Sequence, residues 1–183
     1  MTVDHVAWRN SRPRKRMGSG ALIRDLEGRV LVVEPTYKPS WELPGGSVEA
    51  DESPRAAAAR EVHEELGLRI TLGRLLCIEW QGPEPERSES LMCIYDGGVL
   101  TGLDGVRLPP DELASCRFVA PEHLDDFLVE RLARRTRAAL LALAEDRVVE
   151  LEHGVPVPDT GSGRRRSAGP GQAPSDDAAT TFA

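Results

Sequence analysis

Apolar and polar positions alternate along the middle of the chain in a way that predicts a mixed α/β domain. Apolar runs bounded by turn residues are typical of strands, and they occur at residues 20–25, 29–35, 91–100 and 115–120, and at residues 69–81, which predict one long strand or a bent strand pair. Apolar positions at helical spacing fill residues 54–66 and the region that opens at Pro121. Because strands outnumber helices, we expect a mixed β-sheet with helices packed on its faces.

The two ends of the chain differ from this middle part in composition. Residues 1–16 include the basic run RPRKR and predict a flexible arm. Residues 158–183 are rich in Gly, Pro, Ser and Ala and carry almost no apolar side chains, which predicts a disordered tail. A single domain is therefore expected at residues 17–157.

Composition and charge exclude several classes of protein. No apolar run approaches the ~20 residues that cross a bilayer, so no membrane association is expected. The net charge of −7 argues against a binder of nucleic acid polymers, which needs a basic surface. The 3 cysteines form no CxxC pair, so neither disulfides nor a zinc site is indicated, and a reducing cytoplasm is the expected location.

The segment at residues 54–66 has both end signals of a helix. Ser53 is a favoured N-cap, Pro54 suits the first helical position, and Gly67 suits the left-handed residue that ends a helix. At 3.6 residues per turn, three glutamates share an arc of about 100°; they are Glu61, Glu64 and Glu65. Val62 and Leu66 lie on the other side, so we expect these two side chains in the core and the glutamates facing outward.

Such an acidic face is unfavourable by itself. Like charges three or four residues apart destabilise a helix by ~0.2–0.5 kcal/mol per pair, and carboxylates near its C-terminus oppose the dipole. Clustered carboxylates are, however, the oxygen ligands that Mg²⁺ or Mn²⁺ prefers. The preceding Leu43-Pro44-Gly45-Gly46 also predicts a tight loop that can approach a ligand closely.

The stretch Gly46 to Leu68 resembles the Nudix box, G-x5-E-x7-R-E-U-x-E-E-x-G-U with U apolar. All nine specified positions fit at the right spacing: Gly46, Glu52, Arg60, Glu61, Val62, Glu64, Glu65, Gly67 and Leu68. The resemblance implies an α/β/α sandwich and an enzyme that hydrolyses phosphoric anhydride bonds with Mg²⁺ or Mn²⁺. The implied substrate is a small nucleoside diphosphate linked to another group, either in nucleotide housecleaning or of the ADP-ribose and nucleotide-sugar type.

The resemblance also implies roles for individual residues. Glu64 and Glu65 would be metal ligands, Glu61 a ligand or the general base, and the backbone of Gly45 or Gly46 would complete the coordination. Arg60 would orient the carboxylates through charge-assisted hydrogen bonds. Glu52 would stabilise the box rather than take part in chemistry.

Other positions of the general base and of the substrate site stay open. In this family an acidic residue on a later loop can be the base, and Glu112 is the candidate, with Asp111 as the second choice. Tyr37 and Trp41 precede the box and are candidates to stack on the nucleobase of the substrate. The sequence leaves open whether the protein is a homodimer.

A catalytically inactive, ligand-sensing or regulatory Nudix-like module is the alternative function. Such modules tend to lose glutamates of the box and to be fused to a DNA-binding domain. Here the box is complete and the flanking segments are short, so we expect an enzyme.

Overall fold

The computed structural model describes residues 5–158, and these residues form one mixed sheet covered by helices. The eight strands are β1 (Arg16–Arg24), β2 (Val30–Pro35), β3 (Gly45–Ser47), β4 (Leu75–Gln81), β5 (Ser90–Val99), β6 (Leu113–Val119), β7 (Val149–Glu152) and β8 (Val155–Pro156). The helices are α1 (His5–Asn10), α2 (Pro54–Leu66), the 3₁₀ helix η1 (Pro121–Asp126) and α3 (Glu130–Ala144). The expected mixed α/β architecture is therefore confirmed.

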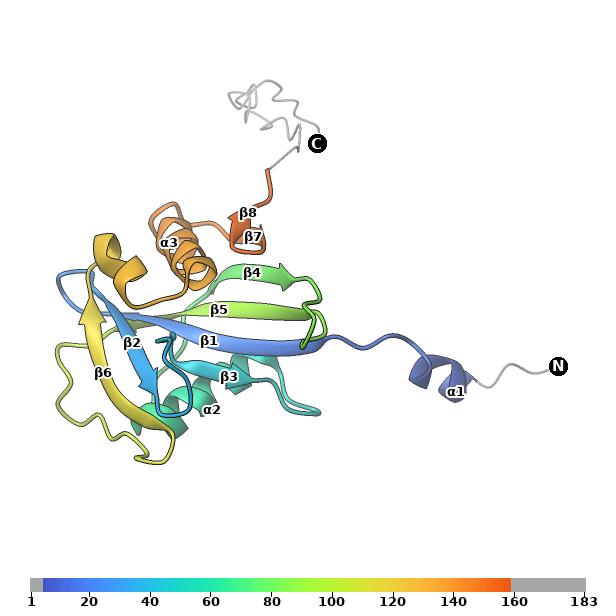
Figure 1. Cartoon of the computed structure of the whole chain (residues 1–183), viewed down its shortest axis with the longest axis horizontal. Coiled ribbons are helices and arrows are strands. Elements are labelled where there is room, and N and C mark those ends of the chain that lie inside the picture. Colours follow the sequence, from blue (N-terminus) through green and yellow to red (C-terminus); the bar gives the residue numbers. More distant parts are fainter. Residues whose placement is uncertain (1–4, 159–183) are drawn as a thin grey trace, which may run out of the picture.

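The sheet runs in the order β6-β2-β1-β5-β4-β7-β8, and β3 pairs with β1 outside this path. The pairs β1–β5 and β4–β7 are parallel and the other pairs are antiparallel. Parallel pairs are buried on both faces in known folds. In Figure 1, α3 lies on one side of the sheet and α2 on the other, so the domain has three layers.

Alternating side chains of the central strands fill two separate cores. Leu22, Val30 and Val32 point to the layer of α3, where they pack with small residues of that helix such as Ala139. The residues between them, including Ile23, point to the layer of α2 and pack with Val62 and Leu66. This period of two fixes the register of the strands, because a slip by one residue would exchange the two cores.

The structure corrects the expected strand at residues 69–81. Only Leu75–Gln81 is a strand. The carbonyl oxygens of Leu72 and Gly73 accept hydrogen bonds from the Arg55 guanidinium at 3.0 and 2.7 Å. The Gly73 N–H donates to the carbonyl of Asp96. Side-chain contacts of this kind cannot be read from the apolar pattern.

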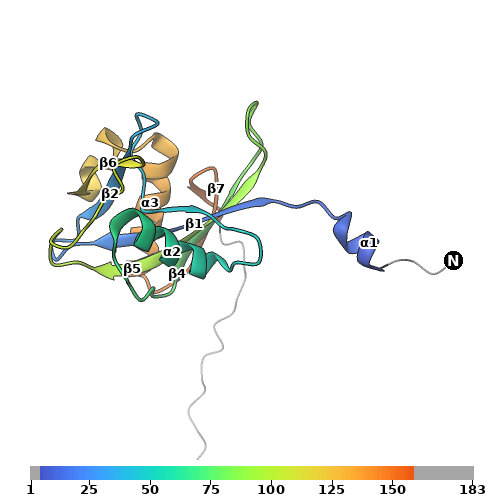
Figure 2. The same ribbon diagram turned by 90° about the horizontal axis from the view of Figure 1, so that it is seen from below.

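The ends of the domain were only partly predicted. Residues 5–10 form the short helix α1, which buries no side chain and stands away from the sheet in both views (Figures 1 and 2). The helical region after Pro121 is divided into η1 and α3. The predicted tail at 158–183 lies, except for Pro158, outside the described residues, so the domain boundaries stay a prediction. Within the described part, no helix is long and apolar enough to cross a membrane.

Candidate active site

Helix α2 carries the acidic residues, and its ends are fixed as the sequence predicted. The Ser53 side chain accepts a hydrogen bond from the Ala56 N–H at 3.2 Å, and Gly67 takes the left-handed conformation with φ of 69°. Val62 and Leu66 are fully buried. The rotation of the helix about its axis is thereby set, and it places the box glutamates at the edge of β3.

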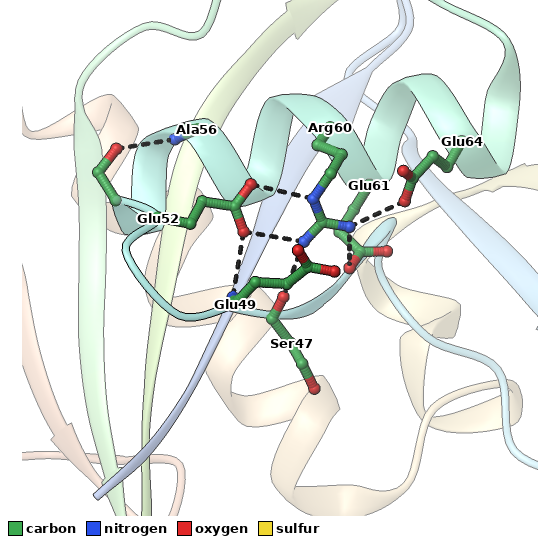
Figure 3. Close-up of polar contacts among 8 residues, drawn as sticks. Ser47, Glu49, Glu52, Ala56, Arg60, Glu61 and Glu64 are labelled. Carbon is green, nitrogen blue, oxygen red and sulfur yellow. Dashed lines mark hydrogen bonds and ion pairs between the residues drawn. The ribbon is translucent and has the colours of Figure 1, made fainter. Parts of the chain in front are cut away.

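Arg60 is the centre of a hydrogen-bond network that joins the box together (Figure 3). Its Nε and Nη2 donate to the two oxygens of Glu52 at 2.9 and 3.0 Å. Its Nη1 donates to Glu61 at 2.9 Å and to Glu64 at 2.8 Å. Nη2 also donates to the carbonyl of Ser47 at 2.9 Å, which connects α2 to β3. The planar guanidinium serves this arrangement better than an ammonium group could, because its donors point in fixed directions.

The pKa values of two carboxyl groups in the network are shifted in opposite directions, that of Glu52 downward and that of Glu61 upward. Hydrogen bonding to Arg60 lowers the pKa of Glu52. Burial raises the pKa of Glu61, although Arg60 opposes this effect. The glutamates of one helix therefore lie in different environments, as groups with separate roles in a site do.

Gly46 allows the backbone of β3 to approach Glu61 closely. A Cβ atom at Gly46 would overlap the Glu61 carboxylate, and even the farther oxygen, Oε2, would lie 2.7 Å away. The residue before it, Gly45, has φ of 148°, which a side chain rarely adopts. The two glycines thus leave room for one carboxylate directly against the backbone.

Glu65 departs from the expected outward orientation. Its Oε2 accepts a hydrogen bond from the Gly45 N–H at 2.9 Å, so the side chain points toward β3. Burial raises the pKa of Glu65 to about 8; the Gly45 N–H opposes this shift, and the nearby carboxylates of Glu61, Glu42 and Glu112 add to it. The helical arc placed the three glutamates on one side, but it could not indicate that the loop before the box folds over one of them.

The raised pKa of Glu65 predicts a pH-dependent stability in the absence of metal. Between about pH 4.5 and about pH 8 the unfolded chain has released this proton while the folded chain still holds it, so a rise in pH favours unfolding. In EDTA, the melting temperature of the wild type should fall more steeply from pH 5 to pH 8 than that of Glu65→Gln. Glu150→Gln removes an exposed glutamate of β7 and is the charge-matched control. Identical slopes for wild type and Glu65→Gln would contradict the assignment.

A second prediction concerns the contact between Gly46 and Glu61. Gly46→Ala should destabilise the protein by about 1–3 kcal/mol, because the carboxylate and the backbone must move apart. Gly102→Ala is the control, since a Cβ atom there meets no atom within 4 Å. Urea unfolding of both variants measures the difference. Equal stability of the two variants would contradict this, because it would show that the Glu61 side chain can move away from the backbone at no cost in the free energy of unfolding.

The remaining predicted residues lie at different distances from this cluster. Glu112 is close enough to Glu65 to raise its pKa, whereas for Asp111 the structure gives only a backbone contact, from Thr36 to its carbonyl. Tyr37 is 73% exposed. The ring of Trp41 packs edge-on against Phe127, with the Arg117 guanidinium on it.

The donor set fits a divalent cation by its chemistry, although it is not assembled around one. The carboxylates of Glu61 and Glu65 face glycine backbone, and a Cβ would fill the space at Gly46. Among residues 5–158, no three acidic, His or Cys side chains are grouped as they would be around a metal ion. The Arg60 Nη1 atom bonds both Glu61 and Glu64 and so holds these carboxylates. Sequence reasoning missed the Ser47 carbonyl and the Gly45 N–H, because backbone partners carry no signal in residue type.

Comparisons with known proteins agree with this geometry. The NUDIX domain family model matches residues 14–143. The chain is 42% identical to a MutT-like protein of Streptomyces ambofaciens over 122 residues, which cover 67% of this chain and 74% of that protein.

Two further similarities are more limited. Over 66 residues the chain is 46% identical to diphosphoinositol polyphosphate phosphohydrolase 2 of Rattus norvegicus, a match that covers 36% of this chain and 37% of the relative. The solved structure of a UDP-X diphosphatase superposes with a TM-score of 0.65 at 22% identity, covering 82% of this chain and 75% of that one. This last likeness concerns the fold alone.

The predictions of an α/β/α fold and of an enzyme acting on phosphoric anhydride bonds are confirmed, and the chain belongs to the Nudix family of hydrolases.

Proposed function

We propose that this protein is a divalent-metal-dependent pyrophosphohydrolase that cleaves a nucleoside diphosphate linked to another group. One observation supports this proposal above the others: three carboxylates of α2 are gathered at β3, where Glu61 and Glu65 lie against the glycine backbone and Arg60 bonds both Glu61 and Glu64. Stability does not favour such an arrangement of like charges. A role in binding cations explains it.

The residues divide the work as follows. Glu64, Glu65 and Glu61 would hold Mg²⁺ or Mn²⁺ together with the backbone of Gly46, and Arg60 and Glu52 would keep the box in shape. A cation held there would supply neutralising charge for the phosphoryl oxygens and lower the pKa of a bound water. Oxygen ligands are the set that these hard cations prefer.

Two carboxylates are candidates for the general base that takes the proton of the attacking water. Glu61 is in the box, and burial raises the pKa of its carboxyl group, which makes its carboxylate a stronger base. Glu112 comes from the loop before β6 and lies near Glu65. Glu61→Gln and Glu112→Gln distinguish them, because only the loss of the base should change the pH profile of kcat on its acidic side.

The identity of the group linked to the diphosphate and the residues that contact the nucleoside are indicated by fewer observations. The relatives are named for MutT-like and diphosphoinositol polyphosphate activities, and the family resemblance adds ADP-ribose-like and nucleotide-sugar substrates. Tyr37 and Trp41 remain candidates for contact with the nucleoside. The cytoplasmic location and a homodimer also remain predictions.

A substrate panel tests the function. The purified chain is incubated with nucleoside triphosphates, ADP-ribose, UDP-sugars and dinucleoside polyphosphates, with Mg²⁺, with Mn²⁺ or with EDTA, and released phosphate and nucleoside monophosphate are measured. Metal-dependent release from at least one compound is expected. Metal-independent binding without hydrolysis of any compound would favour the inactive sensor module instead.

A further inference from the structure

A second, positively charged site lies next to the glutamate cluster, on the face of the sheet that α3 covers. It is a cleft of about 330 Å³ between the strands β1, β4 and β5 and the first turns of α3. Residues Gly45, Gly46 and Ser47 of β3 line it as well. The same three residues contact the box, through the Glu65 carboxylate, the Glu61 carboxylate and the Arg60 guanidinium. One short strand therefore separates the cleft from the candidate metal ligands.

Four arginines from distant parts of the sequence line this cleft: Arg16, Arg87, Arg131 and Arg135. Arg135 is only 5% exposed, and its Nε donates to the buried Glu79. No described residue accepts a hydrogen bond from either terminal nitrogen of Arg135. These two nitrogens are therefore donors that can form hydrogen bonds with a ligand in the cleft.

Arg131 lies one helical turn before Arg135 and has even fewer partners. Its Nη1 atom is buried and has no hydrogen-bond partner within the described part of the chain. Burial, together with the charge of Arg135, lowers the pKa of this guanidinium. A buried donor without an acceptor is destabilising, and so is the approach of two cations. An anion in the cleft would relieve both.

The acidic groups nearby do not supply that anion. Glu42 lines the cleft, but its carboxylate is paired with Lys38 at 2.6 Å. Glu79 lies fully buried beneath the cleft; its Oε2 accepts from Arg135, whereas its Oε1 has no hydrogen-bond partner among the described residues and so does not pair with Arg131. Glu84, in the connection between β4 and β5, acts on Arg131 only as a more distant charge. Four arginines thus outnumber the carboxylates, and the cleft carries a net positive charge.

The lining also indicates what kind of anion it suits. No Phe, Tyr or Trp is among the residues that line the cleft, so it offers no aromatic platform for a nucleobase. Arginine pairs with phosphate through two parallel hydrogen bonds, a geometry that lysine cannot offer.

We propose that the cleft is a phosphate-binding subsite, in which Arg131 and Arg135 hold a phosphate of the substrate other than the diphosphate that is cleaved. This inference rests on the proposed function, because it places the scissile diphosphate at the glutamates and the further phosphate across β3. The substrate class is accordingly a diphosphate compound that carries at least one additional phosphate group.

The test uses inositol hexakisphosphate, which presents phosphates in all directions and has no nucleobase. Its binding is measured by isothermal titration calorimetry in EDTA, so that no metal takes part. The wild type should bind, and Arg131→Gln should weaken binding about tenfold to a hundredfold, the loss expected for hydrogen bonds between charged groups. Arg137→Gln is the matched control: it changes the same helix, but Arg137 is paired with Asp125 and does not line the cleft.

Each alternative outcome contradicts the proposal. Absent binding by the wild type, unchanged binding by Arg131→Gln, or an equal loss in both variants would each overturn the subsite; the last would indicate general attraction to basic residues. Adenosine that binds more tightly than inositol hexakisphosphate, with no effect of Arg131→Gln, would assign the cleft to a nucleoside. Arg87→Gln, an exposed cleft position, gives a second variant with little risk to the fold, and it should also weaken binding.

The outcomes separate this inference from the proposed function. Loss of inositol hexakisphosphate binding in Arg131→Gln, together with no hydrolysis of any panel compound, would keep the subsite and overturn the hydrolase activity. Metal-dependent hydrolysis that inositol hexakisphosphate does not inhibit would do the reverse. If both proposals are right, inositol hexakisphosphate inhibits competitively, and Arg131→Gln raises its inhibition constant about tenfold or more.

Discussion

Replacing Glu64 with glutamine is expected to lower kcat for hydrolysis about a hundredfold to a thousandfold, the effect of removing one electrostatic contact to the reacting group. The amide keeps the shape of the side chain but loses the charge that a cation requires. The side chain is 53% exposed, and among the described residues its carboxylate bonds only Arg60, so the fold should be retained. The rate is measured with saturating Mg²⁺ on the compound that the panel identifies.

The control for this variant is Glu150→Gln, which makes the same change at an exposed position of β7. In the sheet, β5 and β4 separate β7 from β1. It should keep the wild-type rate. A Glu64→Gln protein with kcat within about twofold of the wild type would remove this residue from the metal site, since even changes to residues that only support the ligands of a metal reduce activity about 10–100-fold.

Replacing Arg60 with lysine is the second change with a large expected effect. Arg60 makes five hydrogen bonds, to Glu52, Glu61, Glu64 and the carbonyl of Ser47. A lysine ammonium cannot bond all four of these partners at once, so the mutual repulsion of the three carboxylates would be less well neutralised. We expect a loss of about 1.5–3 kcal/mol in the free energy of unfolding, and a lower kcat because Glu61 and Glu64 lose their common orientation.

Arg55→Lys is the matched control for this change, because Arg55 lies on the same helix but, within residues 5–158, contacts only the carbonyls of Leu72 and Gly73 and the face of the Tyr95 ring. It should lower stability to a smaller extent and leave kcat unchanged. Urea unfolding and steady-state kinetics measure both quantities. The network would be dispensable if Arg60→Lys behaved like Arg55→Lys in both measurements.

Local signals in the sequence were sufficient for the acidic helix. Ser53, Pro54 and Gly67 marked its ends, and the spacing of Val62 and Leu66 set its buried face. The glutamates had to share the remaining side, because a helix of fixed pitch leaves no other choice. These features depend on neighbours within a few residues, so they could be predicted from the local spacing of residue types in the sequence.

Features that depend on long-range contacts could not be predicted in this way. The inward orientation of Glu65 follows from a hydrogen bond to Gly45, which is twenty residues away. The cleft combines Arg16, Arg87 and α3, and only the sheet topology brings these segments together. The spacing of Arg131 and Arg135, one helical turn apart, was the single local signal of that cleft.

Direct measurement of metal binding tests the central claim, namely that the carboxylates of α2 exist to hold divalent cations. Mn²⁺ is titrated into the wild type and into the double variant Glu61→Gln/Glu64→Gln, and free Mn²⁺ is followed by electron paramagnetic resonance. The account predicts that the wild type removes Mn²⁺ from solution and that the double variant largely fails to do so. Equal binding by the two proteins, or no binding by either, would contradict it.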